Sequence, residues 1–268
     1  MSGKVPNVLS IAGSDPSGGA GVQADIKTIS ALGCYGMAAI TALTAQNTQR
    51  VSGIHVVPAD FVTAQLNAVF DDLDIAAVKI GMVAQLSTIE AIAAVLSRKS
   101  PKHVVLDPVM VATSGDRLLS ADAVSALRER LIPLASLITP NLPEAAALLG
   151  DPVASDETAI ACQGKRLLAM GARAVLIKGG HGQASESIDT LFSGSDVIAL
   201  PAARIATKNT HGTGCSLASA IAAGLAKGEM LETAVRSAKL WITAAIEAAD
   251  RLGIGHGHGP IHHFHRFD

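Results

Sequence analysis

Short runs of β-branched and apolar residues alternate along this chain with longer segments rich in alanine and leucine. The short runs fit buried strands, and the longer segments place apolar residues three and four positions apart, as amphipathic helices do. This alternation predicts right-handed βαβ crossovers, and therefore an α/β fold in which helices cover both faces of a central, mainly parallel sheet. The predicted strands are 8–13, 76–81, 103–109, 136–141 and 174–180, and the predicted helices are 21–33, 58–73, 86–98, 120–131, 157–171, 213–227 and 230–252.

The chain is expected to fold as one domain. No Pro/Ser-rich linker, internal repeat or low-complexity block divides the 268 residues. Two further segments, 37–47 and 51–58, are expected to add strands beside the main sheet. We therefore treat residues 1–268 as a single domain.

Charge and cysteine content exclude several classes of partner. The 21 basic and 23 acidic residues are spread along the chain, so no basic surface for nucleic acid or an anionic membrane is expected. Cys34, Cys162 and Cys215 lack the spacing of a disulfide framework or a zinc site, and are expected to be reduced thiols. Residues 1–6 lack the apolar core of a signal peptide, and no apolar stretch reaches the length of a membrane span. These features favour a cytoplasmic enzyme with a small-molecule partner.

Polar or glycine-rich segments follow four of the predicted strands. In an open parallel sheet, ligands bind beyond the carboxyl ends of the strands. Four such segments at one edge therefore predict one shared site. They are GSDPSGGAG (13–21), DPV (107–109), TPNLPE (139–144) and KGGHG (178–182).

The segment HGTGCS (211–216) comes directly before a predicted helix. Gly212 and Gly214 permit a tight turn whose backbone amides can hold an anion such as a migrating phosphoryl group. Cys215 would lie on the first helical turn, where the helix dipole favours a lowered thiol pKa and a role as a general base. The alternative is structural, with two turn glycines and a small first-turn residue.

Asn141 and Glu144 stand three residues apart after another strand. Amide and carboxylate oxygens suit Mg²⁺ in phosphoryl transfer. The alternative is a helix start, because Pro143 fits the first turn and an acidic residue there complements the helix dipole.

Two other segments carry weaker signals. The glycines of 13–21 do not follow the dinucleotide-binding spacing, so they favour a tight turn or close approach to a small substrate, with Asp25 on the next helix available to bind a polar group. The histidine-rich end, 253–267, lacks the acidic or cysteine partners of a designed metal site, and is expected to fold over the protein as a tail.

Taken together, these motifs resemble a known family. The segments IAGSDPSGGAGVQADIKT, ALTAQNT, VKIGM, VVLDPVM, LITPNLPEAAALL, IKGGH, KNTHGTGCSLASAIAAGLAKG and GHGHGPIHHFH occur in order between residues 8 and 265. In this order they are similar to the hydroxymethylpyrimidine and hydroxymethylpyrimidine-phosphate kinases of thiamine biosynthesis, within the ribokinase superfamily. The resemblance implies a ribokinase-like fold, usually a homodimer, that uses ATP and Mg²⁺ to phosphorylate 4-amino-5-hydroxymethyl-2-methylpyrimidine and then its monophosphate.

The resemblance also assigns residues to roles. Gln46 is the clearest expected contact to the pyrimidine, because its amide can both donate to a ring nitrogen and accept from the amino group. Asp107 is expected to join Glu144 in the magnesium network. The resemblance implies a pyrimidine pocket of Gly13, Ala20, Asp25, Gln46, Met82 and Val109, a nucleotide side of Asn141, Lys178, Thr210 and Lys239, a metal side of Asp107 and Glu144, and a catalytic segment of Gly212, Gly214 and Cys215.

Three other functions stay open at this point. A pyridoxal kinase of the same superfamily would also act on a flat ring with a hydroxymethyl group, and Cys215 in place of the aspartate of sugar kinases does not exclude it. A non-catalytic pyrimidine-binding protein would not need the GTGC segment together with Asn141 and Glu144. An NAD-linked oxidoreductase has only the weak glycine signal behind it.

Overall fold

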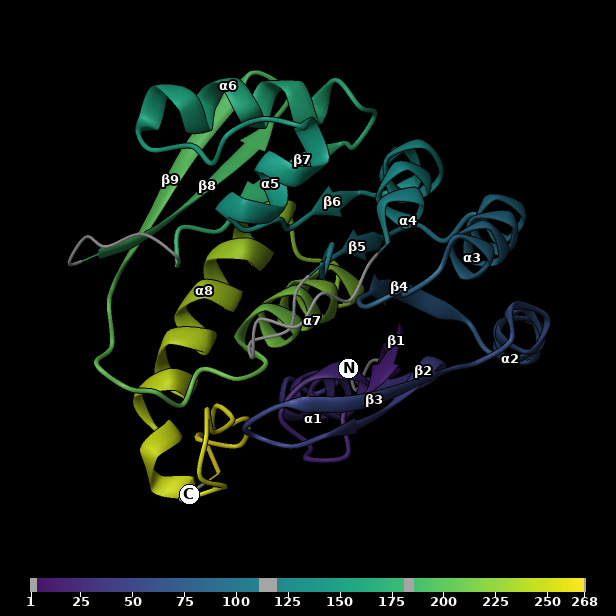
Figure 1. Cartoon of the computed structure of the whole chain (residues 1–268), viewed down its shortest axis with the longest axis horizontal. Helices are drawn as coiled ribbons and strands as arrows, with labels where there is room; N and C mark the ends of the chain where they lie inside the picture. Colours follow the sequence, from purple (N-terminus) through teal and green to yellow (C-terminus); the bar gives the residue numbers. More distant parts are fainter. Residues whose placement is uncertain (1–3, 111–119, 181–185, 268) are drawn as a thin grey trace.

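The computed structural model describes residues 4–110, 120–180 and 186–267, and nine strands within these ranges form one sheet (Figure 1). The order across the sheet is β3-β2-β1-β4-β5-β6-β7-β8-β9. Neighbours from β2 to β7 pair in parallel, whereas β3, β8 and β9 pair antiparallel at the two sides. The strands are β1 (Asn7–Ser14), β2 (Tyr35–Gln46), β3 (Val51–Val56), β4 (Ile75–Ile80), β5 (Val104–Leu106), β6 (Leu137–Ile138), β7 (Ala174–Ile177), β8 (Glu186–Ser193) and β9 (Asp196–Ala203).

Helices cover both faces of the sheet, which confirms the predicted α/β architecture (Figure 1). On one face, α2 to α6 bury their apolar sides; on the other, α1 and α8 flank α7, whose residues 216–225 are all buried. An element enclosed on several sides is apolar all round, which explains the continuous Ala/Leu/Ile run of α7. The helices are α1 (Gly21–Ala31), α2 (Ala59–Asp72), α3 (Leu86–Lys99), α4 (Ala121–Ala126), α5 (Leu142–Leu149), α6 (Glu157–Leu168), α7 (Thr213–Ala226) and α8 (Leu231–Glu247).

The structure corrects several of the predicted elements. The strands predicted at 103–109 and 136–141 are shorter, and the helix predicted at 230–252 ends at Glu247, with a 3₁₀ turn (Ala249–Leu252) after it. The sequence reading did not predict β8 and β9, which form an antiparallel pair beside β7. The helix predicted at 120–131 is regular only as far as Ala126, and a π-helical turn (Leu127–Leu131) and a 3₁₀ turn (Ile132–Leu134) follow. Pro133 explains the change, because its ring cannot donate a backbone hydrogen bond and collides with the carbonyl four residues earlier.

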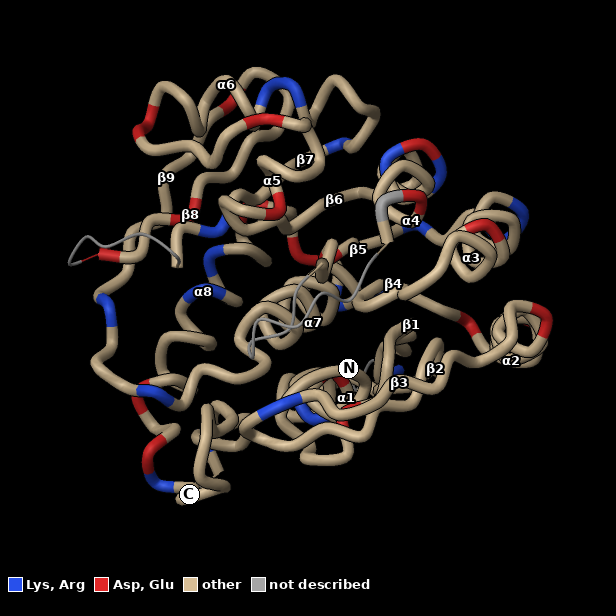
Figure 2. Tube along the Cα trace, viewed as in Figure 1, with Lys and Arg blue, Asp and Glu red and all other residues tan. Residues whose placement is uncertain are grey.

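Acidic and basic residues are interspersed over the described part of the chain, as Figure 2 shows. None of the helices in the described ranges is long and apolar enough to cross a membrane.

The carboxyl ends of the parallel strands meet the start of α7 and the C-terminal tail (residues 253–267). Parallel bridges join Asn141 to Lys178 and His211 to Pro260. Gly212 adopts the left-handed conformation, with φ of 78°, and a Cβ there would overlap the carbonyl oxygen of Gly19. The glycine-rich loop after β1 and the loop before α7 therefore pack backbone against backbone, which only glycine permits.

Candidate active site

Cys215 lies on the first turn of α7, as the sequence predicts, but its electrostatic surroundings differ from the prediction. The thiol is partly exposed, and the backbone N–H of Gly21 donates a hydrogen bond to it. Burial raises the pKa of Cys215 to about 11, and the negative charge of Asp25 acts in the same direction. Lys79 and the Gly21 amide lower the pKa, but their effect is smaller. The prediction of a lowered pKa was therefore wrong for the free protein: removing water from the thiolate outweighs the helix dipole.

A fully buried ion pair lies behind Cys215. Lys79 on β4 donates to both carboxylate oxygens of Asp25 on α1, at 2.8 Å each. The hydroxyls of Ser10 and Ser219 donate to the same carboxylate at 2.6 and 2.8 Å. Burial lowers the pKa of Lys79, but Asp25 and other negative groups outweigh this effect and raise it to about 12. Asp25 was predicted to bind substrate; in this structure its carboxylate is saturated by protein donors.

A second charged cluster joins the ends of three strands beside the start of α7. Lys178 donates to Asp107 at 2.7 Å and lies 3.8 Å from a carboxylate oxygen of Glu144. Thr139 donates to the same oxygen of Asp107 at 2.9 Å. A Cβ added to Gly214 would lie 3.2 Å from the Lys178 ammonium and 3.5 Å from Asp107. The glycine therefore leaves this cluster in direct contact with the α7 turn.

Asn141 and Glu144 form a capping box at the start of α5. The Asn141 side chain accepts from the Glu144 amide, and the Glu144 carboxylate accepts from the Asn141 amide, both at 2.8 Å. The helix-start alternative is thus correct for these contacts, yet Glu144 also faces Lys178 and Asp107. Burial raises the pKa of Glu144 to about 7, although Lys178 opposes the change. A carboxylate that titrates near neutrality beside a lysine is typical of a functional site.

Two residues predicted on the nucleotide side have partners within the protein. Lys239 on α8 is buried, pairs with Asp189 at 2.7 Å and donates to the Ser187 carbonyl. The Thr210 carbonyl accepts from the hydroxyl of Thr213, which fixes the turn into α7. Their assignment to the nucleotide side stays a prediction.

The residues predicted for the pyrimidine pocket come from the ends of β1, β2, β4 and β5 and from α1, where Ala20 is the N-cap residue and Asp25 lies on the helix. A Cβ on Gly13 would overlap the Met82 methyl group, so the two are in contact. Thr41 donates to the Met82 carbonyl at 2.8 Å, which fixes that segment. Val109 packs against the core on the α2–α6 face of the sheet, and its amide donates to the Asp107 carbonyl.

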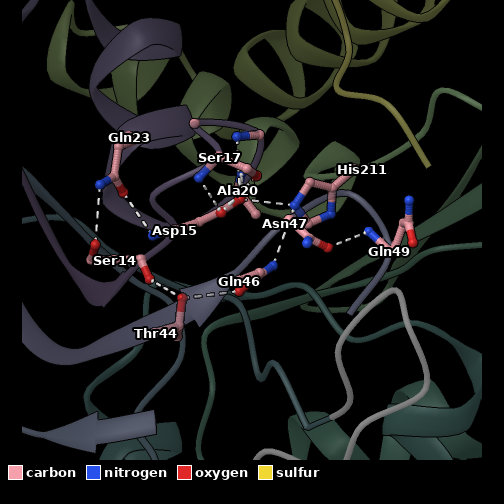
Figure 3. Close-up of polar contacts among 12 residues, drawn as sticks. Ser14, Asp15, Ser17, Ala20, Gln23, Thr44, Gln46, Asn47, Gln49 and His211 are labelled. Atoms are coloured by element: carbon pink, nitrogen blue, oxygen red, sulfur yellow. Dashed lines mark hydrogen bonds and ion pairs between the residues drawn. The ribbon is translucent and has the colours of Figure 1, made fainter. Parts of the chain in front are cut away.

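Figure 3 shows a network around Gln46 that the sequence reading missed. Asp15 accepts from the imidazole Nε2 of His211 at 2.8 Å, and also from the Ala20 amide at 2.8 Å. The amide nitrogen of Gln46 lies 3.4 Å from the same Nε2. Asp15 and His211 both stand in motifs singled out from the sequence, but nothing local indicates that two segments 196 residues apart are joined through them.

The C-terminal tail packs onto the protein, as predicted. Thr48 accepts backbone hydrogen bonds from the tail at Gly257 and His258, and Asn209 accepts one from Gly259. His263 shares a hydrogen bond of 3.1 Å with the buried hydroxyl of Ser216, one residue after Cys215. In the described part of the chain, no three or more His, Cys, Asp or Glu side chains are grouped to hold a metal ion.

A family model described as phosphomethylpyrimidine kinase matches residues 15–262. The chain belongs to this family. It is similar to the hydroxymethylpyrimidine/phosphomethylpyrimidine kinase of Rhizobium meliloti (strain 1021), with 58% identity over 259 residues and 97% of each chain covered.

Solved structures agree with this membership of the phosphomethylpyrimidine kinase family. Phosphomethylpyrimidine kinase from Clostridium difficile 630 is 41% identical, with a TM-score of 0.80, and 91% of this chain and 100% of that chain are covered. The pyridoxal kinase from Staphylococcus aureus in complex with AMP-PCP and pyridoxal is 31% identical, with a TM-score of 0.88, and 97% and 94% are covered. The resemblance inferred from the motifs and the predicted fold class are both confirmed, and the protein is a kinase.

Proposed function

We propose that this kinase transfers a phosphoryl group from ATP to the hydroxymethyl oxygen of 4-amino-5-hydroxymethyl-2-methylpyrimidine, and a second one to the monophosphate, giving the diphosphate for thiamine biosynthesis. The names of the relatives support this substrate, since several match over nearly the whole chain at 53–58% identity. The observation that carries the chemistry is the start of α7, where Cys215 and the first-turn amides of Gly214 and Cys215 lie between the Lys79–Asp25 pair and the Lys178–Asp107 cluster.

The start of α7 would supply the acceptor side of the transfer. The amides of Gly212, Gly214 and Cys215 have no partners within the helix and can hold negative charge on the migrating group. The Thr213 amide is engaged, since it donates to the Thr210 carbonyl at 3.2 Å. Cys215 would take the proton of the substrate hydroxyl. Only the thiolate can accept that proton. Because the raised pKa leaves most of the thiol protonated, the active form is the small deprotonated fraction, which the ammonium of Lys79 stabilises.

The nucleotide would lie against the Lys178 cluster. Similar pyridoxal kinases have been solved with ADP and AMP-PCP, which supports ATP as the donor. Asp107 and Glu144 offer carboxylate oxygens beside one another, and Mg²⁺ commonly uses one or two carboxylates together with phosphates and water, so the residues fit this ion. Bound Mg²⁺ would neutralise charge on the phosphates. Asn141, Lys178, Thr210 and Lys239 complete the proposed nucleotide side.

Gln46, Gly13, Ala20, Met82 and Val109 form the proposed pyrimidine side. Because the Asp25 carboxylate is filled by Lys79, Ser10 and Ser219, we assign it an indirect role through Lys79.

Incubation with ATP, Mg²⁺ and the pyrimidine, with the products separated over time, tests the proposal. The monophosphate should appear first and the diphosphate should follow at its expense. A protein that binds the pyrimidine but forms neither product would instead be a non-catalytic binding protein. A parallel incubation with NAD instead of ATP tests the oxidoreductase alternative, which reduction of NAD would support.

Pyridoxal phosphorylation is a second candidate, because several of the similar structures are pyridoxal kinases with TM-scores of up to 0.90. We expect a higher kcat/KM for the pyrimidine than for pyridoxal. The reverse order would assign the chain to pyridoxal.

A homodimer through the β2–β3 hairpin completes the proposal. The hairpin leaves Leu43 and Ile54 exposed by 46% and 42%, and β3 is an edge strand with pairing groups available. Sedimentation should give twice the mass of the chain, and Leu43→Lys should reduce it to the monomer.

A cytoplasmic setting would suit both the supply of ATP and the free thiols.

A further inference from the structure

The side-chain amide of Gln46 has two polar neighbours, one near its oxygen and one near its nitrogen. Gln46 is the last residue of β2; its Oε1 lies 3.2 Å from the Thr44 hydroxyl and its Nε2 lies 3.4 Å from the His211 Nε2 (Figure 3). The oxygen and nitrogen of a carboxamide are nearly the same size, so the amide fits this space either way round. The protons of its neighbours decide which orientation is stable.

Thr44 can only accept a hydrogen bond from Gln46. Its hydroxyl lies 2.8 Å from the Ser14 carbonyl oxygen, which carries no proton, so the single hydroxyl proton is donated there. A lone pair of the hydroxyl then faces the Gln46 amide. This lone pair favours the nitrogen end of the amide over the oxygen end.

His211 can only donate a hydrogen bond from Nε2. Its partner Asp15 also accepts from the Ser17 amide and hydroxyl and from the Gly19 and Ala20 amides. Burial raises the pKa of Asp15, but the hydrogen bonds from His211 and Ser17 outweigh it and lower the pKa, so the group is a carboxylate. A carboxylate needs a donor, so His211 Nε2 carries a proton, and this proton favours the oxygen end of the Gln46 amide.

We propose that Thr44 and His211 are positioning residues that fix the Gln46 amide with its nitrogen toward Thr44 and its oxygen toward His211. In this orientation Thr44 accepts an N–H, and the amide oxygen shares the His211 proton with Asp15. One N–H and one oxygen lone pair of Gln46 are left for a ligand, in a fixed order. The consequence for substrate rests on the proposed function, in which Gln46 contacts the pyrimidine.

The fixed order of the Gln46 N–H and oxygen favours one arrangement of donor and acceptor on the edge of the pyrimidine. The 4-amino ring offers a nitrogen acceptor beside an amino donor, whereas the 4-oxo analogue offers an N–H donor beside an oxygen acceptor. The ring cannot turn over to compensate, because its hydroxymethyl group must face Cys215. A fixed amide therefore rejects the oxo analogue, since accepting it would leave polar groups unpaired, and the expected discrimination is on the order of 10²-fold or more.

Neutron diffraction from deuterium-exchanged protein without ligand tests the orientation independently of any activity. We expect two deuterium atoms on the Gln46 atom that faces Thr44 and one on Nε2 of His211. Two deuterium atoms on the Gln46 atom that faces His211 would overturn the proposal.

Kinetics with the 4-amino and 4-oxo pyrimidines test the consequence. Thr44→Val should lower the ratio of the two kcat/KM values by roughly five- to tenfold, the value of about one neutral hydrogen bond, and Thr44→Ser should restore it. Ser17→Ala is the matched control, because it removes a contact to the other oxygen of Asp15 and should leave the ratio unchanged. Equal losses for both substrates in Thr44→Val would mean a structural role and contradict the proposal. If the wild-type protein phosphorylates neither pyrimidine, the proposed function fails, and the neutron map still decides the orientation.

Discussion

The chemistry proposed at Cys215 depends on the charges packed around it. The thiol lies close to the positive charge of Lys79 and to the negative charges of Asp25 and Asp107, and burial adds its own cost to the thiolate. The resting form is therefore the thiol. Only the small thiolate fraction can then take the proton of the substrate hydroxyl.

The pH dependence of kcat/KM should report this resting state. Because the pKa of Cys215 is raised to about 11, the deprotonated fraction grows about tenfold per pH unit between pH 7 and pH 10. We expect kcat/KM for the pyrimidine to rise with pH over that range, and the residual activity of Cys215→Ala to lack this rise. A profile that levels off near pH 7 would mean a much lower pKa in the free protein.

Glu144→Gln should separate activity from stability. The pKa of Glu144 in the folded protein is about 7, above its ordinary value of 4.5, so the folded state holds the proton more tightly. Wild-type stability therefore falls as the pH rises from about 4.5 to 7, and this loss is complete above pH 7. Glutamine keeps the capping contact and does not titrate, so at pH 8 the variant should be more stable by about 1 to 3 kcal/mol.

Denaturant unfolding at pH 8 and pH 5 measures this difference, which should shrink at the lower pH. Kinase activity of the same variant should fall, and its Mg²⁺ requirement should move to higher concentration. A variant that loses stability at pH 8 would contradict the cost assigned to the buried carboxylate.

Among the elements, the turn before α7 is the one on which the site depends most. Gly212 brings the anion-holding amides against the 18–20 loop, which Asp15 ties to His211. Gly212→Ala should displace one of the two loops, lower stability by more than about 2 kcal/mol and abolish activity. Gly228 is a matched control, because its φ of 87° is similar but nothing lies within 4 Å of a Cβ there.

Thermal unfolding and turnover of both glycine variants check this prediction. Gly228→Ala should lose only about 1 to 2 kcal/mol and keep its activity. Equal effects in the two variants would show that left-handed strain, and not contact between the loops, explains the result.

The elements that the sequence predicted best are those with a strong local pattern. Seven elements lie within a few residues of their predicted ranges: the strands β1, β4 and β7 and the helices α1, α2, α3 and α7. Each of them carries one repeated pattern of apolar residues along its length. The pair β8–β9 was missed; only Asp189, Leu191, Phe192 and Leu200 are buried within it, and β9 includes Pro201. Proline is tolerated there because β9 is an edge strand.

At the scale of the whole molecule, the C-terminal tail joins parts of the site that are distant in sequence. It contacts the β2–β3 turn at Thr48, the loop before α7 at Asn209 and the first turns of α7 at Ser216. The sequence predicted a folded tail but not these partners, since hydrogen bonds over 47 to 209 residues leave no local pattern. The same holds for the Lys79–Asp25 and Lys178–Asp107 pairs. The resemblance assigned Asp25, Asp107 and Lys178 to the site, but nothing in the sequence indicates which residues pair with them.

His263 should make the folded protein sensitive to acid. Burial lowers its pKa to about 3, from an ordinary value of 6.5, so the neutral form is favoured in the folded state. Stability due to this residue is complete above pH 6.5 and is lost as the pH falls toward 3, with about 2 kcal/mol lost by pH 5. His263→Gln should lose less stability than the wild type between pH 7 and pH 5.

Denaturant unfolding at pH 7 and pH 5 gives the slope of stability against pH for each variant, with His256→Gln as the control at an exposed position. The control should show the same slope as the wild type. A slope in His263→Gln equal to that of the wild type would place the acid sensitivity elsewhere.

One site is proposed to carry out both phosphoryl transfers, with Cys215 as the base for the hydroxyl acceptor of the first. The most direct measurement is the rate of each step, with the pyrimidine and with its monophosphate, in wild-type protein and Cys215→Ala, together with nucleotide binding by calorimetry. The first rate should fall by about 10² to 10⁴ while nucleotide affinity stays within a few fold. The second rate should fall less, because a phosphate monoester is already largely deprotonated at neutral pH. A near-wild-type first rate in Cys215→Ala would contradict the role of this thiol as the base.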